Sequence, residues 1–180
     1  TVSALLDIPI HYTIVTNFSG LKQLVDAVGG LDVDVKEALI DNEYPCSYNE
    51  YLACGITIQP GLQHMDGARV LEYTRCRKGT CGNDFGRAER QQEIIGLLMA
   101  QLVQPKIWLN PARAAAVSDA LRSGIETDMS ALTMARLARR WSQQSDEPIR
   151  WVLSTASGGL LTSSPGSTNL VPVGGDYSAI

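Results

Sequence analysis

The chain has 180 residues, of which 44% are hydrophobic and 19% are charged, and its formal net charge is −4. That length allows one domain with a packed core. An acidic chain without a long basic face is a poor nucleic-acid binder, because neutralisation of phosphates supplies most of that affinity, so we expect no nucleic-acid partner. No apolar run approaches the roughly 18 residues that a membrane-spanning helix needs.

The first 35 residues alternate between strand and helix patterns. Residues 11–16 alternate polar and apolar side chains and are rich in β-forming residues, which predicts a strand. Apolar residues between 21 and 28 recur at helical spacing, with Asn17 or Ser19 as the cap and two glycines after the last turn. Residues 31–35 predict a second strand. Strand, helix and strand in so short a segment indicate an α/β fold.

An irregular stretch and two helices follow. Residues 36–60 are rich in Tyr, Asn and Asp and predict a long loop that ends in a Pro-Gly turn. Asp66 is expected to cap a short helix. Residues 76–83 predict a loop that connects this helix to the next element. That element is a long helix from about 85 to 103, with Asp84 as its cap.

The last third of the chain predicts two further helices and two strands. One helix starts at Asn110–Pro111, which pairs a cap with a first-turn proline, and the other starts near Asp128. Residues 149–153 predict a strand. The tail from Ser154 predicts a loop that leads to an edge strand at residues 170–173.

The four cysteines lie in two groups that are close in sequence, Cys46 near Cys54 and Cys76 near Cys81. An even number in short-range pairs is typical of small disulfide loops, and the sequence alone leaves all three pairings of four cysteines open. Free thiols and a metal site are the alternatives, although neither pair has the close spacing of common zinc sites. Disulfides would place the protein outside the cytoplasm.

The arginines are concentrated in one part of the sequence. Within 22 residues of an otherwise acidic chain lie Arg69, Arg75, Arg77, Arg87 and Arg90. In an extended backbone Arg75 and Arg77 would project to the same side. Arg87, Arg90 and Gln91 share one face of the predicted long helix, and that face continues with apolar residues. The cations therefore gather near the start of a helix, on a face that points towards apolar protein.

Electrostatics favours an anion among these arginines. A helix N-terminus carries partial positive charge, so a cation placed there costs roughly 0.3–1 kcal/mol. Arginine binds phosphate bidentately, free helix amides add donors, and a pyrophosphate suits four cations better than one phosphate does. The alternative is a structural network in which the arginines pair with nearby carboxylates, namely Asp66, Glu72, Asp84, Glu89 and Glu93.

The other charged residues predict no site. Arg136, Arg139 and Arg140 occupy the solvent side of an amphipathic helix, and His11 and His64 are isolated histidines that we expect to be structural. The sequence contains no glycine-rich phosphate loop, zinc-protease motif or serine-nucleophile elbow.

Five segments of the chain, taken together, have a known counterpart. They are His11–Val15 with Phe18, Leu24–Val33, Pro60–Gly67, Tyr73–Arg77 and Asp84–Gln91. Their order and spacing, over roughly residues 1–105, resemble the LytR-CpsA-Psr family of bacterial cell-envelope proteins. The arginine segments are the most specific part of the resemblance.

The resemblance implies an α/β/α sandwich with a central mixed sheet flanked by helices, in a membrane-anchored protein outside the cytoplasm. A hydrophobic cleft would hold a polyprenyl chain. By matching position, the residues that would bind its pyrophosphate are Arg75, Arg77, Arg87 and Gln91. Asp84 and Arg90 would orient and neutralise that site. The expected catalytic set is Arg75, Arg77, Asp84, Arg87 and Arg90, with no metal ligand among them.

The implied activity is phosphotransfer. A glycopolymer would move from its polyprenyl-pyrophosphate carrier to a peptidoglycan hydroxyl, assisted by Mg²⁺. Such a reaction needs mainly positioning and charge neutralisation, which arginines and a metal supply. The carrier-linked glycopolymer, peptidoglycan and a membrane are therefore the expected partners.

Two features depart from the family pattern. The family's domain normally begins well before Thr1, with strands that carry metal-binding aspartates and a further arginine. We therefore expect residues 1–180 to be the larger, C-terminal part of one extracytoplasmic domain, with residues 106–180 forming helices and the final strands. The Mg²⁺ ligands and the membrane anchor would lie outside this chain, which alone is not expected to be catalytically competent.

The four cysteines are the second departure from the family pattern. A Cys76–Cys81 bridge would fix the loop between the two arginine groups, so that oxidation would tune the site.

Three other functions compete with the transferase. A non-catalytic polyprenyl-phosphate binding module or envelope-stress regulator would use the same site without turnover. A hydrolase would use water in place of the sugar hydroxyl. A transcriptional regulator is the least favoured, because the sequence has no helix-turn-helix with a basic recognition helix and its net charge has the wrong sign.

Overall fold

The computed structural model describes residues 3, 9–47, 51–82, 84–143, 161–163 and 170–172. The chain divides into two compact units. One consists of residues 13–148, and the other of residues 1–12 together with 149–180. The candidate site lies wholly in the first unit.

The first unit begins with a short strand and a capped helix. β1 covers Ile14–Thr16, so the strand predicted at 11–16 is shorter than expected, and all three of its residues are exposed. α2 spans Phe18–Val28 and confirms the predicted helix. Of the two candidate caps, Asn17 is the one used: its Oδ1 accepts a backbone N–H of the first turn at 2.7 Å. The helix ends at Gly29, whose φ of 94° favours glycine.

The second predicted strand is present and has a partner that the sequence did not reveal. β2 (Leu31–Val35) alternates buried and exposed residues, as predicted. It pairs antiparallel with β5 (Gly61–Met65), with Leu31 opposite Met65. Only a turn was predicted at the start of β5. The strand escaped detection because its apolar pattern is weak, with Leu62 74% exposed.

Two more strands occupy the segment predicted as one irregular loop, residues 36–60. β3 (Leu39–Asp41) and β4 (Ile56–Ile58) pair antiparallel. The prediction of a continuous loop was therefore wrong at both ends of this segment. Strands of three residues are too short for an alternating pattern to stand out from the background.

Two helices carry the arginine segments. α3 (Gly67–Arg75) starts at its predicted cap, Asp66, which accepts the backbone N–H of Arg69 at 2.8 Å. α4 (Asp84–Leu102) confirms the predicted long helix, with Asp84 as its first helical residue rather than as the cap outside it. The loop between these helices contains the 3₁₀ turn η1 (Gly79–Cys81).

The helices predicted for the last third are also present. α6 (Pro111–Gly124) begins at its predicted cap, Asn110, and α7 (Ala131–Gln143) begins close to its predicted start. The sequence did not predict the short helix α5 (Pro105–Trp108) or the strand β6 (Ile125–Thr127). β6 pairs antiparallel with β1, which joins the start of this unit to its last third.

The second unit contains one described pair of strands. β7 (Leu161–Ser163) pairs antiparallel with β8 (Leu170–Pro172). β8 confirms the edge strand predicted at 170–173, whereas β7 lies in a segment predicted as loop. The strand predicted at residues 149–153 falls outside the described residues.

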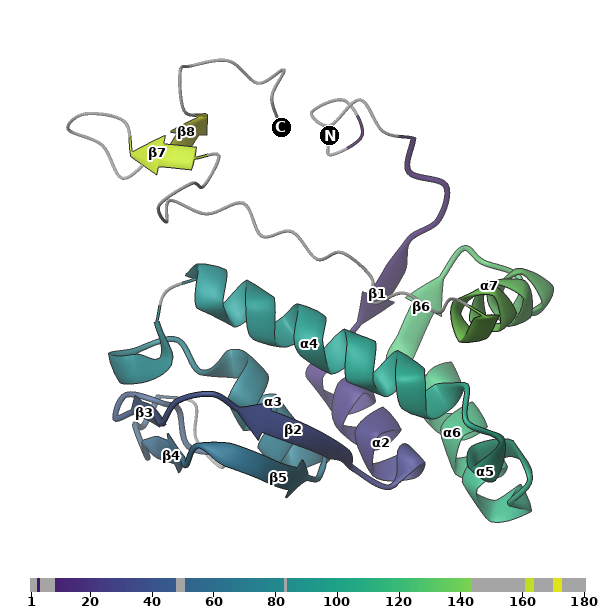
Figure 1. The fold of residues 1–180 in the computed structure, drawn as a ribbon, viewed down its shortest axis with the longest axis horizontal. Helices are drawn as coiled ribbons and strands as arrows, with labels where there is room; N and C mark the ends of the chain where they lie inside the picture. The colour runs from purple at the N-terminus through teal and green to yellow at the C-terminus, as the bar shows by residue number, and fades with distance from the viewer. Residues whose placement is uncertain are drawn as a thin grey trace. The chain divides into compact units, whose positions relative to one another are not determined.

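The elements of the first unit pack around one core and confirm the α/β class. α2 contacts both α6 and α3, and α4 contacts β2, α2 and α3 (Figure 1). Fully buried side chains fill the space between them, including Val25, Leu31, Val33, Ile58, Met65, Val70, Ile94 and Ile107. Each described strand pairs with one antiparallel partner. In the part of the chain that the structure describes, no helix is long and apolar enough to cross a bilayer.

α2 is held against its neighbours by two close glycine contacts. A Cβ added to Gly20 would lie 2.4 Å from the Cα of Gly124 in α6. A Cβ added to Gly67, at the start of α3, would lie 2.2 Å from the carbonyl oxygen of Lys22 in α2. Both neighbours are backbone atoms, so no change of rotamer could relieve the clash. These contacts fix the position of α2 between α3 and α6.

Gly20→Ala is therefore expected to lower the free energy of unfolding by about 1–3 kcal/mol, because the added methyl must push α2 away from α6. Urea unfolding followed by circular dichroism measures the change. Ser19→Ala, at an exposed position of the same helix, is the control and should change it by less than about 0.5 kcal/mol. Wild-type stability of Gly20→Ala would contradict the close approach of the two helices.

Candidate functional site

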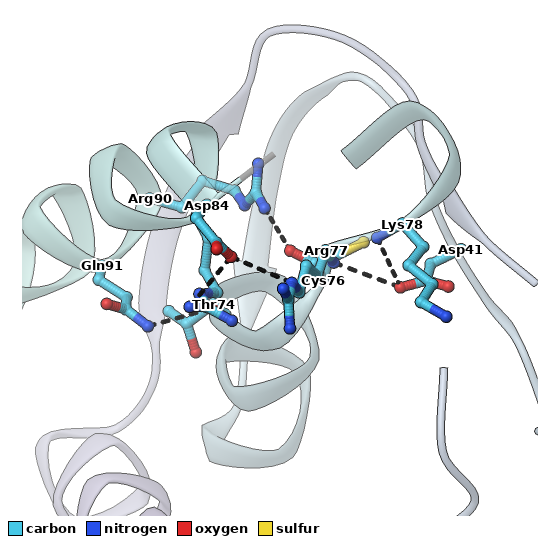
Figure 2. A network of polar contacts seen from close by, with 9 residues as sticks. Asp41, Thr74, Cys76, Arg77, Lys78, Asp84, Arg90 and Gln91 are labelled. Atoms are coloured by element: carbon cyan, nitrogen blue, oxygen red, sulfur yellow. Dashed lines mark hydrogen bonds and ion pairs between the residues drawn. The ribbon is translucent and has the colours of Figure 1, made fainter. Parts of the chain in front are cut away.

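The arginine segments meet around the loop between α3 and α4, and Arg90 shapes that loop. Arg90 is 9% exposed, and its guanidinium donates to three backbone carbonyls. Nε donates to the oxygen of Tyr73 and Nη1 to that of Cys81, both at 2.9 Å. Nη2 donates to the oxygen of Cys76, the bond that Figure 2 shows. Burial lowers the pKa of Arg90 from its ordinary value. Arg90 is thus placed to position the loop, and its role at the pyrophosphate stays a prediction.

A buried carboxylate that the sequence analysis missed holds the other side of the loop. Asp41, at the end of β3, is 3% exposed. Its Oδ2 accepts the backbone N–H groups of Arg77 at 3.3 Å and Lys78 at 3.1 Å, and its Oδ1 accepts that of Glu43 at 2.9 Å. Burial alone would raise the pKa of Asp41, but the N–H groups of Lys78, Arg77 and Glu43 outweigh it and hold that pKa below its ordinary value.

The tip of the loop is fastened to β3 as well. Thr80 Oγ1 donates to the carbonyl oxygen of Ala38 at 2.7 Å and accepts the backbone N–H of Ile40 at the same distance. Gly79 has a φ of 62°, and a Cβ there would lie 2.1 Å from the carbonyl oxygen of Ile40. Only glycine fits this position. The loop that carries Arg77 is therefore docked on a strand, although it has little regular structure of its own.

Two of the predicted phosphate-binding arginines converge on one carboxylate oxygen. Asp84 Oδ1 lies 3.0 Å from Arg77 Nε and 3.1 Å from Arg87 Nη2. All three side chains reach solvent, with exposed fractions of 59% for Arg77, 56% for Asp84 and 34% for Arg87.. Asp84 also lies in the first turn of α4, where a negative charge is favourable and offsets the unfavourable placement of Arg87. The group keeps one net positive charge at the surface.

Arg75 and Gln91 make other contacts than this group does. Arg75 ends α3, and its guanidinium carbon lies 4.5 Å from the ring centroid of Phe18 and 5.8 Å from that of Tyr44. Gln91 is exposed on α4, and its amide donates to the carbonyl oxygen of Thr74 over a long 3.5 Å. At this length the bond is weak.

The carboxylates of the alternative structural network are only partly engaged with the arginines. Glu72 pairs with Arg69, and Asp84 pairs with Arg77 and Arg87. Glu93 instead accepts the hydroxyl of Tyr73 at 2.7 Å. Burial and that bond to Glu93 raise the pKa of Tyr73. In the part of the chain that the structure describes, Arg75 makes no ion pair with a carboxylate. The arginine cluster thus retains charge for an external anion.

The cysteines pair locally in the structure, Cys46 with Cys54 and Cys76 with Cys81. Cys76 and Cys81 bracket the loop that carries Arg77, as the sequence analysis anticipated. Together with Asp41 they are also the described residues that come closest to a metal site, with ligand atoms within 4.8 Å of one another. Paired sulfurs and a carboxylate committed to N–H groups do not suit Mg²⁺, which prefers several oxygen ligands and water. These residues therefore offer no fit for the expected magnesium ion.

Sequence comparison decides the family. The sequence profile of the LytR_cpsA_psr family matches residues 1–160. The chain belongs to this family. The predicted resemblance to this family is confirmed. The match also extends beyond residues 1–105, over which the resemblance was expected.

Individual LytR_cpsA_psr relatives agree with this assignment. The chain is 32% identical, over 146 residues, to the polyisoprenyl-teichoic acid–peptidoglycan teichoic acid transferase TagU of Halalkalibacterium halodurans. That match covers 81% of the chain and 41% of the relative, so the chain spans less than half of the relative's length.

Solved structures of similar proteins share the fold. The crystal structure of Bacillus subtilis TagV superposes with a TM-score of 0.60 at 27% identity, covering 79% of the chain and 50% of TagV. A protein of Enterococcus faecalis that is described as a transcriptional regulator superposes with a TM-score of 0.59 at 30% identity. The latter match covers 78% of the chain and 46% of that protein.

The lowered pKa of Asp41 predicts a pH dependence of stability. A carboxyl whose pKa is lower in the folded state stabilises that state above its unfolded pKa, near 3.8 for Asp41, and the contribution disappears as the pH falls through the folded pKa. Wild type should therefore be more stable than Asp41→Asn at pH 7 and 5. The difference should shrink below about pH 4.

Urea unfolding at pH 7, 5 and 3 measures this difference. Asp119→Asn, at an exposed position of α6, is the control and should show little difference at any pH. A gap between wild type and Asp41→Asn that stays constant down to pH 3 would show that the ionised carboxylate does not hold the loop.

Proposed function

We propose that this chain forms the pyrophosphate-binding part of a phosphotransferase that moves a glycopolymer from a polyprenyl-pyrophosphate carrier to peptidoglycan. The observation that carries the proposal is the shared oxygen of Asp84, on which Arg77 and Arg87 converge at the surface. The name of the TagU relative, a polyisoprenyl-teichoic acid–peptidoglycan teichoic acid transferase, supports the proposed donor and acceptor classes.

In the proposed reaction, a sugar hydroxyl of peptidoglycan attacks the phosphorus that bears the glycopolymer. A new P–O bond forms, the bond from that phosphorus to the bridging oxygen breaks, and polyprenyl phosphate leaves. The hydroxyl proton passes to solvent or a base. Negative charge grows on the bridging oxygen and stays on the non-bridging ones, where fixed guanidinium groups stabilise it.

The site residues divide this work between binding and positioning. Arg77 and Arg87 would donate to the pyrophosphate oxygens, with Arg75 and Gln91 completing the set of donors. Asp84 would hold two of the guanidinium groups in the orientation that receives the ligand. Arg90 and Asp41 would keep the loop in place without touching the ligand, and this rigidity reduces the cost of ordering the site on binding.

We further propose the surroundings in which the protein works. The two cysteine pairs fit an oxidising, extracytoplasmic location. A polyprenyl-linked carrier lies in a membrane, so the protein would act at a membrane surface. The Mg²⁺ expected from the family would neutralise pyrophosphate charge.

Binding of a short polyprenyl pyrophosphate tests the site. Native mass spectrometry or calorimetry should show one-to-one binding, and Arg87→Ala should weaken it about 10- to 100-fold, because a charge-assisted hydrogen bond of roughly 1.5–3 kcal/mol is lost. Arg136→Ala, an exposed arginine of α7, is the matched control and should bind as wild type does.

Equal binding by wild type and Arg87→Ala would overturn the assignment of this site. If neither binds, repeating the titration on a protein extended upstream separates an incomplete site from structural arginines. Turnover is tested with the extended protein, Mg²⁺ and peptidoglycan fragments. Release of polyprenyl phosphate with labelled product supports the transferase, release without product indicates a hydrolase, and binding without release indicates a binding module.

The cysteine pairing gives a separate prediction. Protein secreted by an oxidising host should contain no alkylatable thiol before reduction and four after it, and peptide mapping should join Cys46 to Cys54 and Cys76 to Cys81. Reduction should leave the fold intact but weaken ligand binding, because the loop that carries Arg77 loses one of its ties. Full alkylation without reduction would contradict the proposed extracytoplasmic disulfides.

A further inference from the structure

Among the arginines of the site, Arg75 has surroundings of a different kind. Arg77 and Arg87 share a carboxylate, and Arg90 is bound to carbonyls. The guanidinium of Arg75 instead lies over the rings of Phe18 and Tyr44, 4.5 Å and 5.8 Å from their centroids. These distances are within the range in which an aromatic ring attracts a cation. Rings cover the face of this guanidinium, while no carboxylate neutralises its charge among the described residues.

The two rings come from separate elements, which together form a fixed bracket. Phe18 is the first residue of α2, and that helix is locked against α3 and α6 by its glycine contacts. Tyr44 follows β3 and is 8% exposed. Its carbonyl oxygen accepts the backbone N–H groups of Cys54 at 2.9 Å and Gly55 at 3.2 Å, which closes the loop that the Cys46–Cys54 pair also closes. The backbone of each ring-bearing residue is therefore held in place.

The charge of Arg75 acts on the hydroxyl of Tyr44. Burial raises the pKa of the Tyr44 hydroxyl, and the positive charge of Arg75 opposes that rise. Tyr44 therefore remains a neutral phenol at physiological pH, and it does not cancel the charge of Arg75. The bracket restrains the guanidinium and leaves its charge available.

We propose that Phe18 and Tyr44 are positioning residues that hold Arg75 ready for the pyrophosphate. A guanidinium covered on its face still presents its N–H groups at its edge, which is the geometry that phosphate oxygens require. Restraint by rings also removes rotamer freedom that a long side chain would otherwise lose on binding. The inference rests on the proposed function, since it assumes that Arg75 contacts the anion.

A double-mutant cycle with inorganic pyrophosphate tests the bracket. Phe18 is 57% exposed, so its substitution should leave the fold intact, which circular dichroism checks. Phe18→Leu should weaken pyrophosphate binding about 3- to 10-fold, the range expected for the loss of one cation–π contact. Phe18→Tyr keeps a ring and should bind within about 2-fold of wild type.

The Arg75→Gln background separates positioning from general stability. If Phe18 acts through Arg75, then Phe18→Leu should have no further effect on binding once Arg75 is glutamine. An Arg75 Nε–H resonance that is shifted upfield by the rings, and that moves downfield in Phe18→Leu but not in Phe18→Tyr, would report the contact directly in the free protein.

The outcomes distinguish this inference from the proposed function. Absence of pyrophosphate binding both by wild type and by the protein extended upstream overturns both. Wild-type binding that Phe18→Leu leaves unchanged, or weakens equally in both backgrounds, overturns the bracket alone. An Arg75 resonance that is the same in wild type and Phe18→Leu does so as well.

Discussion

The site depends on one buried guanidinium. Arg90 reaches from α4 and donates to one carbonyl oxygen in the last turn of α3 and to two in the loop that follows. A single side chain thus holds the end of α3 and the loop that leads to α4. Burying an arginine is costly unless its donors are satisfied, and here three backbone carbonyls accept from its guanidinium. Asp41 completes the arrangement from the opposite side by accepting the N–H groups of Arg77 and Lys78. A positive side chain thus holds the carbonyls of the loop, and a negative one holds its amides.

This division of labour leaves the outer arginines available for a ligand. Asp84 serves as an internal counter-ion for Arg77 and Arg87, which keeps the two guanidinium groups together in the absence of ligand. Arg75 is held without a counter-ion, by aromatic rings. Charge is therefore concentrated where the loop and the helices meet, in a chain whose net charge is negative. Such a local field attracts anions even though the protein as a whole repels them.

The sequence predicted those features whose cause is local. Helix ends were found at Asn17, Asp66 and Asn110 because a capping side chain bonds amides only two or three residues away. Strands of three residues, such as β3 and β4, were missed because periodicity needs a longer window.

The composition of the arginine cluster was predicted, but its internal organisation was not. Helical spacing placed Arg90 on the same face as Arg87, yet only Arg90 is buried, because its acceptors come from three separate positions earlier in the chain. One signal for Asp41 was overlooked. In β3 the buried and exposed positions alternate, and this carboxylate occupies a buried one. The contact of Phe18 with Arg75 joins residues far apart in sequence, and no spacing rule reveals it.

The glycine contacts of α2 have a mechanical consequence. Because Gly20 and Gly67 bring backbone against backbone, α2 is seated between α3 and α6 without compressible side chains at those points. The helix, whose first residue is Phe18, is therefore expected to move as a rigid body. We therefore expect a displacement of α6, or of the β1–β6 pair next to it, to move α2 and Phe18 together.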